Sequence, residues 1–174
     1  GDINQAYVAR LADGREVFVK TQARALPDLF TCEARGLHWL AEARALRVPE
    51  VLHASDADAQ GPACLVLELI EGARPSAQHD EQLGAGLAAL HRAGADGFGL
   101  DHDNYLATLP QANRKRARWS DLYAEQRIAP QVERAAQGGQ LSGALIRRLQ
   151  QLIAKLPELV GPDEPPARLH GDLW

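Results

Sequence analysis

The sequence predicts an α+β protein in which a small antiparallel sheet with one helix precedes a mainly helical part. Strand-like runs bounded by turn residues dominate residues 6–70, and leucine stripes at helical spacing dominate residues 81–156. The character of the sequence changes at residues 71–76. We therefore expect an N-terminal lobe over residues 1–71 and a partial helical lobe over residues 72–174.

The N-terminal part begins with a predicted β-hairpin. Strand-like runs at residues 6–11 and 16–20 flank an Asp-Gly step at residues 13–14. Such a step supplies the positive φ that a tight reversal of the chain needs. The second run contains three consecutive apolar residues, which is typical of a strand covered on both faces. Lys20 is therefore expected to end a largely buried strand.

A helix is predicted over residues 29–44, because apolar residues recur there at spacings of three and four. Glu33 lies beside this apolar face. Residues 48–54 and 63–70 then read as two further strands, separated by an acidic, glycine-containing turn. The predicted order of the N-terminal lobe is strand, strand, helix, strand, strand.

Three helices are predicted in the C-terminal part, over residues 81–93, 119–134 and 141–156. The second should kink or break at Pro130, because proline lacks the amide hydrogen that a helix interior uses. Residues 94–118 are rich in Gly, Asp and Asn and are expected to form mostly loop.

Composition disfavours several classes of protein. A formal net charge of -4 is a poor match for the basic surface of a nucleic-acid binder, so we expect no nucleic-acid partner. No stretch approaches the roughly 20 apolar residues of a membrane span. The N-terminus also lacks signal-peptide regions, so neither membrane insertion nor export is expected. Cys32 and Cys64 lack metal-site spacing, which favours reduced thiols in a cytoplasmic protein.

Three residues have the types that phosphoryl transfer needs: a cation for the phosphates, a carboxylate to hold that cation, and a base for the acceptor hydroxyl. Lys20 and Glu33 suit the first two roles, because a buried ammonium group needs a partner. Asp172, in the terminal His-Gly-Asp-Leu-Trp, suits the third. The alternatives are a surface lysine at a strand end and an Asp that caps a helix or forms a turn. His170 is interpreted as a structural brace.

Segments throughout the chain resemble the fructosamine kinase (ketosamine-3-kinase) family, which belongs to the aminoglycoside phosphotransferase-like branch of the protein-kinase-like fold. These segments, in chain order, are Gly1–Tyr7, Phe18–Lys20, Glu33–Leu37, Val48–Val51, Leu65–Ile70, Leu87–His91 and Leu169–Trp174. A further region, which includes Gly97–Tyr105, Leu109–Asn113 and Trp119, is similar to one that separates fructosamine kinases from aminoglycoside and choline kinases.

The resemblance implies a two-lobe kinase fold that uses ATP. Gly1 and Asp2 would belong to the end of the loop that covers the nucleotide. Lys20 would contact the ATP phosphates and pair with Glu33.

The resemblance also implies a hinge and a catalytic base. Backbone groups of the hinge would bind adenine, and the hinge would consist of Glu68, Leu69 and Ile70. Asp172 would be the base. The family pattern continues to an Asn and a Mg²⁺-binding Asp, so the Mg²⁺ ligands are expected beyond Trp174. The sequence also starts inside a turn-like segment. We therefore expect a longer parent protein and an inactive polypeptide in its present length.

Four residues are candidates for holding the acceptor: Asp103, Asn104, Trp119 and Tyr123. Carboxylates and amides bind sugar hydroxyls, and aromatic faces bind the C–H surfaces of sugars. The alternative for the aromatic pair is a contact within the core or between helices, because residues at i and i+4 are neighbours on one helix face.

The sequence therefore predicts an ATP-dependent phosphotransferase that acts on a hydroxyl of ketosamines, the fructosamine or ribulosamine adducts of proteins and small amines. A first alternative is a kinase of another small alcohol, such as an aminoglycoside or choline. A second is a catalytically inactive nucleotide-binding module.

Overall fold

The computed structural model describes residues 4–58 and 61–171. The chain forms two compact units. The first runs up to Gly94 and includes the segment from Ala167 onward, and the second is Ala95–Pro166. The boundary between the two compact units thus follows Gly94. The functional lobes expected at residues 1–71 and 72–174 stay a prediction.

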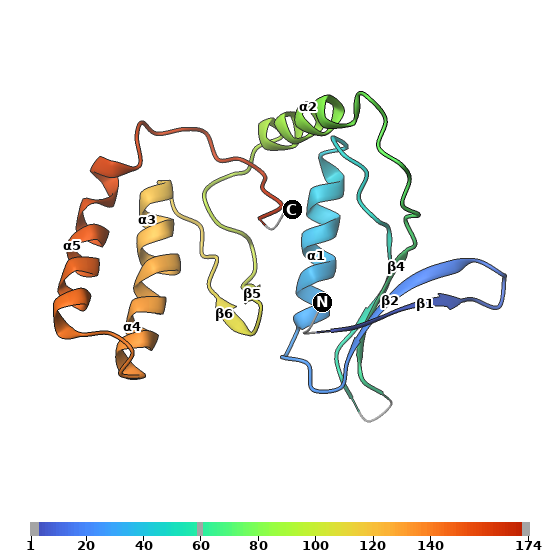
Figure 1. Cartoon of the computed structure of the whole chain (residues 1–174), viewed down its shortest axis with the longest axis horizontal. Helices are drawn as coiled ribbons and strands as arrows, with labels where there is room; N and C mark the ends of the chain where they lie inside the picture. Colours follow the sequence, from blue (N-terminus) through green and yellow to red (C-terminus); the bar gives the residue numbers. More distant parts are fainter. Residues whose placement is uncertain (1–3, 59–60, 172–174) are drawn as a thin grey trace. The chain divides into compact units, whose positions relative to one another are not determined.

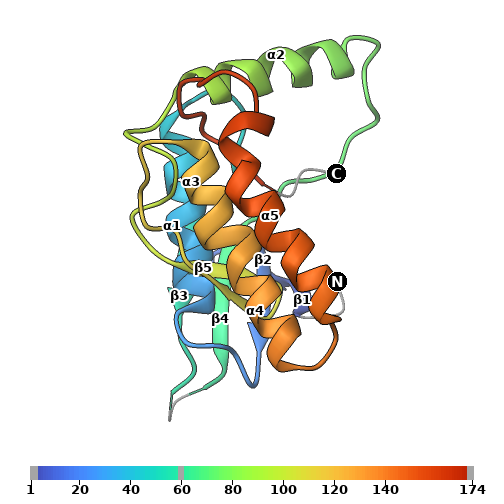
Figure 2. The same ribbon diagram turned by 90° about the vertical axis from the view of Figure 1, so that its left-hand side faces the viewer.

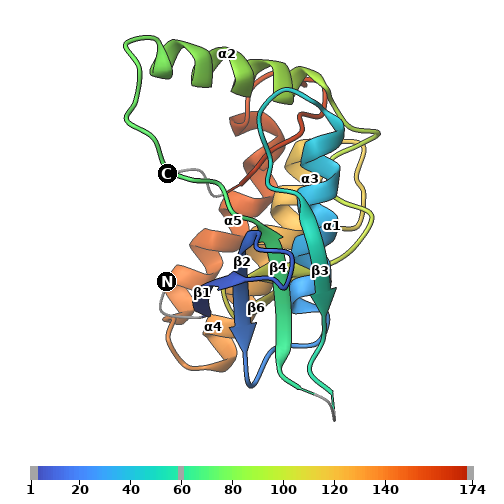
Figure 3. The same ribbon diagram turned by 90° about the vertical axis from the view of Figure 1, so that its right-hand side faces the viewer.

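The first unit is built on a four-stranded antiparallel sheet with the order β1-β2-β4-β3 (Figure 3). Its strands are β1 (Gln5–Arg10), β2 (Glu16–Gln22), β3 (Val51–Ser55) and β4 (Ala63–Glu68). The four predicted strands are therefore confirmed, with boundaries shifted by a few residues.

The β1–β2 hairpin turns where the Asp-Gly step predicted it. Gly14 has φ +87°, and its N–H donates to the carbonyl of Leu11 over 3.0 Å. The Asp13 carboxylate accepts from the backbone N–H of Arg15 at 3.0 Å and from its Nε at 2.8 Å. Local side-chain chemistry therefore fixes this reversal of the chain.

Helix α1 (Leu29–Glu42) contacts β3 and β4 of the sheet (Figure 1). Phe30 of α1 packs with Ala63 and Leu65 of β4, and all three are 0% exposed. Ala34, one turn further along α1, joins this cluster. The helical periodicity of the sequence thus identified Phe30 and Ala34 as buried, whereas Ala41, at the same spacing, is exposed and Leu40 is buried instead.

The expectation that Lys20 ends a strand covered on both faces is wrong. Strand β2 continues to Gln22, two residues past Lys20. Val17 is buried, whereas Phe18, Val19 and Lys20 are partly exposed. Helix α1 packs mainly on β3 and β4, so the consecutive apolar residues of β2 are less covered than their pattern predicts.

Helix α2 (His79–Arg92) completes the helices of the first unit. Gly86 of α2 lies close to Leu46, because a β-carbon built at Gly86 would stand 2.3 Å from Leu46 Cδ2. The middle of α2 and the connection that follows α1 are therefore in tight contact.

The second unit is mainly helical. Its helices are α3 (Trp119–Tyr123), the π-helical segment η1 (Ala124–Ile128), α4 (Ala129–Gln137) and α5 (Gly143–Leu159). Helix α5 packs beside α4, η1 and α3 (Figure 2). The Ser142 hydroxyl caps α5 by accepting from the N–H of Leu145 over 3.3 Å.

The predicted break at Pro130 takes a milder form. Pro130 lies in the first turn of α4, where the absence of its amide hydrogen is tolerated. The wider η1 turn directly precedes α4. The chain therefore accommodates the proline by a π-turn and a new helix start instead of a sharp interruption.

A second correction concerns residues 94–118, which the sequence predicted to be mostly loop. They include a short hairpin of β5 (Asn104–Leu106) and β6 (Leu109–Gln111). Ala107 has φ +55° in the connecting turn. Strands of three residues are too short to show an alternating pattern, so the sequence gave no periodic signal for them.

Two expectations about the chain as a whole can be compared with the structure. Cys32 and Cys64 do not form a disulfide. In the described ranges, no helix has the length and apolar character needed to cross a membrane.

Removing the Phe30 ring should destabilise the first unit strongly, because the ring is fully buried between α1 and the sheet. We expect Phe30→Ala to lower the free energy of unfolding by about 3–5 kcal/mol. Chemical denaturation of the whole protein measures this loss. Val8→Ala is the control, since Val8 is 59% exposed, and an equal loss in both variants would contradict the assigned core.

Candidate functional site

The strongest predicted pair of site residues forms a direct ion pair in the first unit. The Lys20 ammonium donates to both carboxylate oxygens of Glu33, over 2.7 Å to Oε1 and 2.8 Å to Oε2. Lys20 projects from β2, and Glu33 from the first half of α1. The predicted pairing of these two side chains is therefore present.

The surroundings of the pair favour a fixed geometry. In the sheet, Lys20 is opposite Ala6 on β1 and Leu65 on β4. Its Nζ also lies 5.9 Å from the centroid of the Phe30 ring. The side chains of Lys20 and Glu33 are 23% and 34% exposed. Partial burial strengthens the attraction between the charges, while the remaining exposure leaves the ammonium open to an anionic ligand.

The predicted hinge follows the last residue of β4. Glu68 is that residue, and its N–H donates to the carbonyl of Glu50 over 2.8 Å. The sequence predicted a strand through Ile70, but β4 ends at Glu68. Across residues 4–58 and 61–171, the structure records no hydrogen bond from the backbone of Leu69 or Ile70. Their peptide groups are thus available to a ligand, as adenine binding at a hinge would require.

The Glu68 side chain has a structural task of its own. Its Oε1 accepts from Nη2 of Arg47 over 2.5 Å, and its Oε2 accepts from the N–H of Glu50 over 3.3 Å. The hydrogen bond from Arg47, followed by the one from Glu50, lowers the pKa of Glu68. The carboxylate therefore joins the end of β4 to the segment that leads into β3.

Three predicted site residues lie outside the described residues. They are Gly1 and Asp2 of the nucleotide-covering loop and the predicted base, Asp172. The described part of the terminal segment ends at Gly171, which has φ +88°. His170 is exposed and has a partner. The catalytic role of Asp172 stays a prediction.

The second unit contains a cavity of about 400 Å³ whose lining includes two of the four predicted acceptor residues, Asp103 and Tyr123. Asn104 and Trp119 are not among its lining residues. The lining comprises Asp103, Leu106, Pro110, Gln111, Ala112, Tyr123, Gln126, Arg127, Ile128, Pro130 and Gln131.

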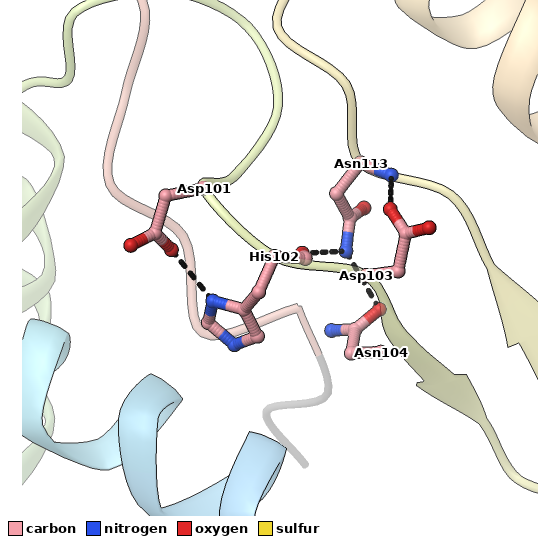
Figure 4. A network of polar contacts seen from close by, with 5 residues as sticks. All are labelled: Asp101, His102, Asp103, Asn104 and Asn113. Atoms are coloured by element: carbon pink, nitrogen blue, oxygen red, sulfur yellow. Dashed lines mark hydrogen bonds and ion pairs between the residues drawn. The ribbon is translucent and has the colours of Figure 1, made fainter. Parts of the chain in front are cut away.

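A polar network centred on Asn113 holds one wall of this cavity (Figure 4). Asn113 is 3% exposed, and its backbone N–H donates to Oδ1 of Asp103 over 2.8 Å. Its Nδ2 donates to the carbonyl of His102 at 3.1 Å and to Oδ1 of Asn104 at 2.8 Å. The Asn104 oxygen also accepts from Gln111 Nε2 over 3.0 Å. The side-chain oxygen of Asn104 thus braces the β5–β6 hairpin.

The network continues through His102, whose side chain is 7% exposed. Its Nδ1 is 2.6 Å from Oδ1 of Asp101, as Figure 4 shows. This contact fixes the imidazole beside the backbone that carries Asp103. The side chains of Asp101, His102 and Asn113 therefore hold the backbone through residues 101–104 in place.

Trp119 and Tyr123 stack on each other, with ring centroids 4.5 Å apart and planes 16° from parallel. Their exposed fractions are 37% and 39%. Tyr123 lines the cavity, and its stacking partner Trp119 is not among the lining residues. Both rings are too exposed for a contact within the core, and Tyr123 combines the stack with a place in the cavity. A role of either ring in sugar binding stays a prediction.

Arg127 is a cavity residue that the sequence did not single out. Its Nη1 donates to the carbonyl of Ala112 over 2.6 Å, and its Nη2 donates to Oδ1 of Asn113 over 2.5 Å. Burial lowers the pKa of Arg127, and the nearby Asp103 opposes that shift. The sequence signal for such a residue is weak, because an arginine on an amphipathic helix is normally interpreted as solvent-exposed.

An antiparallel sheet whose strand lysine is held by a helix carboxylate is the arrangement by which kinases orient nucleotide phosphates. The first unit thus belongs to the kinase-like class of folds, as the sequence predicted.

Comparison with known proteins identifies the family. The sequence model of the family described as fructosamine kinase matches residues 1–174. A solved structure from Thermobifida fusca, provisionally described as a fructosamine-3-kinase, has a TM-score of 0.86 and 40% sequence identity, covering 99% of this chain and 59% of that one. The chain therefore belongs to the fructosamine kinase family, and the predicted α+β, protein-kinase-like fold is confirmed.

Curated relatives agree with this assignment. A probable ketoamine kinase from Klebsiella aerogenes is 36% identical over 177 residues, which cover 100% of this chain and 59% of the relative. The probable ketoamine kinase YniA from Escherichia coli is 37% identical over 178 residues, with the same coverage. The chloroplastic protein-ribulosamine 3-kinase from Arabidopsis thaliana is 33% identical over 168 residues, covering 93% of this chain and 50% of the relative. The chain thus spans about three fifths or less of these relatives.

Removing the Arg47 guanidinium should raise the pKa of Glu68 toward its ordinary value of 4.5. Because the folded-state pKa is lowered, the contribution of Glu68 to stability is present above that ordinary value and is lost as the pH falls through the folded-state pKa. Carbon-13 NMR titration of the Glu68 carboxyl group in the parent protein and in Arg47→Ala measures the change. Arg148→Ala, on the exposed surface of α5, should leave the pKa unchanged, and an unchanged value in Arg47→Ala would refute the assignment.

Proposed function

We propose that the whole protein containing this chain transfers the terminal phosphoryl group of ATP to a hydroxyl of a ketosamine. The observation that carries the proposal is the two-oxygen ion pair between Lys20 and Glu33, in a chain matched along its whole length by the fructosamine kinase family. The relative named as a protein-ribulosamine 3-kinase supports the sugar-amine class of acceptor.

The described residues fit ATP in two respects. The Lys20 ammonium is fixed by Glu33 and stays partly exposed, so it can donate to a phosphate oxygen as a second anionic partner. The backbone groups of Leu69 and Ile70 follow the end of β4 and can bind the adenine edge. Bound ATP would supply the phosphoryl group, and Mg²⁺ held by residues beyond Trp174 would compensate its charge.

Each protein group has a distinct part in this reaction. Glu33 keeps the Lys20 ammonium in one orientation, so that the cation requires little reorganisation when charge develops on the phosphates. Asp172 orients the acceptor hydroxyl and accepts its proton. Gly1 and Asp2 belong to the loop that covers the nucleotide.

The cavity of the second unit is our candidate for part of the acceptor site. Asp103 provides a carboxylate for sugar hydroxyls, and Tyr123 provides an aromatic face for C–H groups. Asn104 and Trp119 support this wall from behind, through the Asn113 network and the stack on Tyr123. A ketosamine combines hydroxyls with a protonated amine, and the Asp103 carboxylate suits both groups.

Cys32 and Cys64 do not form a disulfide, which suits a reducing compartment, and we propose a cytoplasmic location. The Arabidopsis relative carries the description chloroplastic. No nucleic acid or membrane partner forms part of the proposal.

Replacing the base should abolish most turnover without unfolding the protein. We expect Asp172→Asn to lower kcat for phosphorylation of a fructosamine or ribulosamine by about 100- to 10,000-fold, because the amide cannot accept the proton. Coupled ADP-release assays on the whole protein measure this change. Asp163→Asn is the matched control, since Asp163 is an exposed carboxylate in the linker before the terminal segment.

The same assay separates the competing functions. Turnover of aminoglycosides or choline, with none of ketosamines, would replace the acceptor and keep the enzyme class. Nucleotide binding without turnover of any acceptor would indicate an inactive binding module. If the parent protein turns over no ketosamine, and Asp172→Asn behaves in the assay like the parent, the proposed function is rejected.

A further inference from the structure

Arg168 reaches from the terminal segment to the C-terminal end of α1. Its Nη1 donates to the backbone carbonyl of Trp39, across a separation of 129 residues. The guanidinium carbon lies 4.4 Å from the centroid of the Trp39 ring. Nη1 also lies 3.4 Å from Oε2 of Glu42, and Nε donates to the carbonyl of Gly94 over 3.5 Å. One side chain thus joins the terminal segment to the ends of α1 and α2.

The end of α1 has a specific need for this cation. In this fully described helix, the last turn contains no basic residue. The N–H of Ala43 bonds to the carbonyl of Leu40 over 3.2 Å, a spacing of three residues, so it does not serve the Trp39 carbonyl four residues back. Arg168 supplies both a donor for that carbonyl and a positive charge for the negative end of the helix dipole.

The Arg168 side chain is 13% exposed, which distinguishes it from a surface arginine. Its guanidinium lies over the Trp39 ring while its N–H groups donate to carbonyl oxygens. A lysine has a compact ammonium and cannot do both at once. The contact therefore depends on the shape of the guanidinium as well as on its charge.

Both ends of this connection lead to the proposed site. Trp39 lies six residues after Glu33 on α1, which corresponds to about 9 Å along the helix axis. In the other direction, Arg168 precedes the predicted base Asp172 by four residues in the chain. Helix α1 is a rigid element, so a segment fixed to its end keeps a constant relation to the Lys20–Glu33 pair.

We propose that Arg168 is a positioning residue, which fixes the segment leading to Asp172 on the helix that holds the phosphate-binding lysine. This inference rests on the proposed function, because it gives Arg168 a task only if Asp172 and Lys20 act on one reaction. In this role Arg168 acts through the segment that it holds, and not through contact with the nucleotide or the acceptor. Its contribution is to hold the base at the distance from the phosphates that in-line transfer requires.

The test compares kcat with nucleotide affinity in variants of the whole protein. Arg168→Ala should lower kcat about 100-fold, the effect of a misplacement of roughly 1 Å, while the Kd for ATP stays close to that of the parent. The kcat of Arg168→Lys should lie between those of the parent and Arg168→Ala, since lysine keeps the charge and loses the planar fork. The matched control is Arg92→Ala, which removes an exposed arginine from the last turn of α2.

A purely structural role gives a different pattern. In that case Arg168→Ala would lower the melting temperature but leave kcat per folded molecule unchanged well below that temperature, and the inference would be overturned. An equal loss of kcat in Arg92→Ala would also overturn it. If Arg168→Ala fails to fold, Arg168→Lys takes its place in the test. A lower kcat with an unchanged Kd for ATP then supports the positioning role, and an unchanged kcat overturns it.

The outcome also separates this inference from the proposed function. A parent protein that phosphorylates no acceptor would overturn both. A parent protein that is active, with an Arg168→Ala variant of equal kcat, would overturn the positioning role alone. Loss of kcat with unchanged ATP affinity supports both.

Discussion

A lysine ammonium group that is partly buried over a sheet needs a fixed counter-charge, and this constraint organises the first unit. Lys20 is carried by β2, and Glu33 supplies two carboxylate oxygens from α1. The position of Glu33 follows from hydrophobic packing, because Phe30 lies one helical turn earlier and is fully buried against β4. The same burial that stabilises the sheet therefore sets the geometry of the ion pair.

Helix α1 joins packing, charge and the terminal segment in one element. Its first turn enters the hydrophobic core through Phe30, its second turn presents Glu33, and its last turn accepts the guanidinium of Arg168 through Trp39. A displacement of α1 would therefore change all three contacts together. Structural stability and the proposed phosphoryl transfer depend on the same helix.

Features set by local sequence were predictable, and features set by distant contacts were not. The Asp13-Gly14 turn and the apolar face of α1 follow from local backbone and periodicity rules, and the Lys20–Glu33 pair followed once the fold was assumed. The β5–β6 hairpin was missed because its strands are three residues long. Arg168 was missed because its partner on α1 is 129 residues away. In the second unit, Asp103 and Tyr123 were two of the four residues that the sequence proposed for acceptor binding, and only the structure places these two around one cavity.

The most direct test of the central claim is a crystal structure of the whole protein with a non-hydrolysable ATP analogue and Mg²⁺. Our account predicts that Nζ of Lys20 lies within hydrogen-bond distance of a phosphate oxygen while still bound to Glu33, and that the carboxylate of Asp172 faces the terminal phosphate in the same cleft. A nucleotide bound away from Lys20, or an Asp172 on a separate surface, would contradict it.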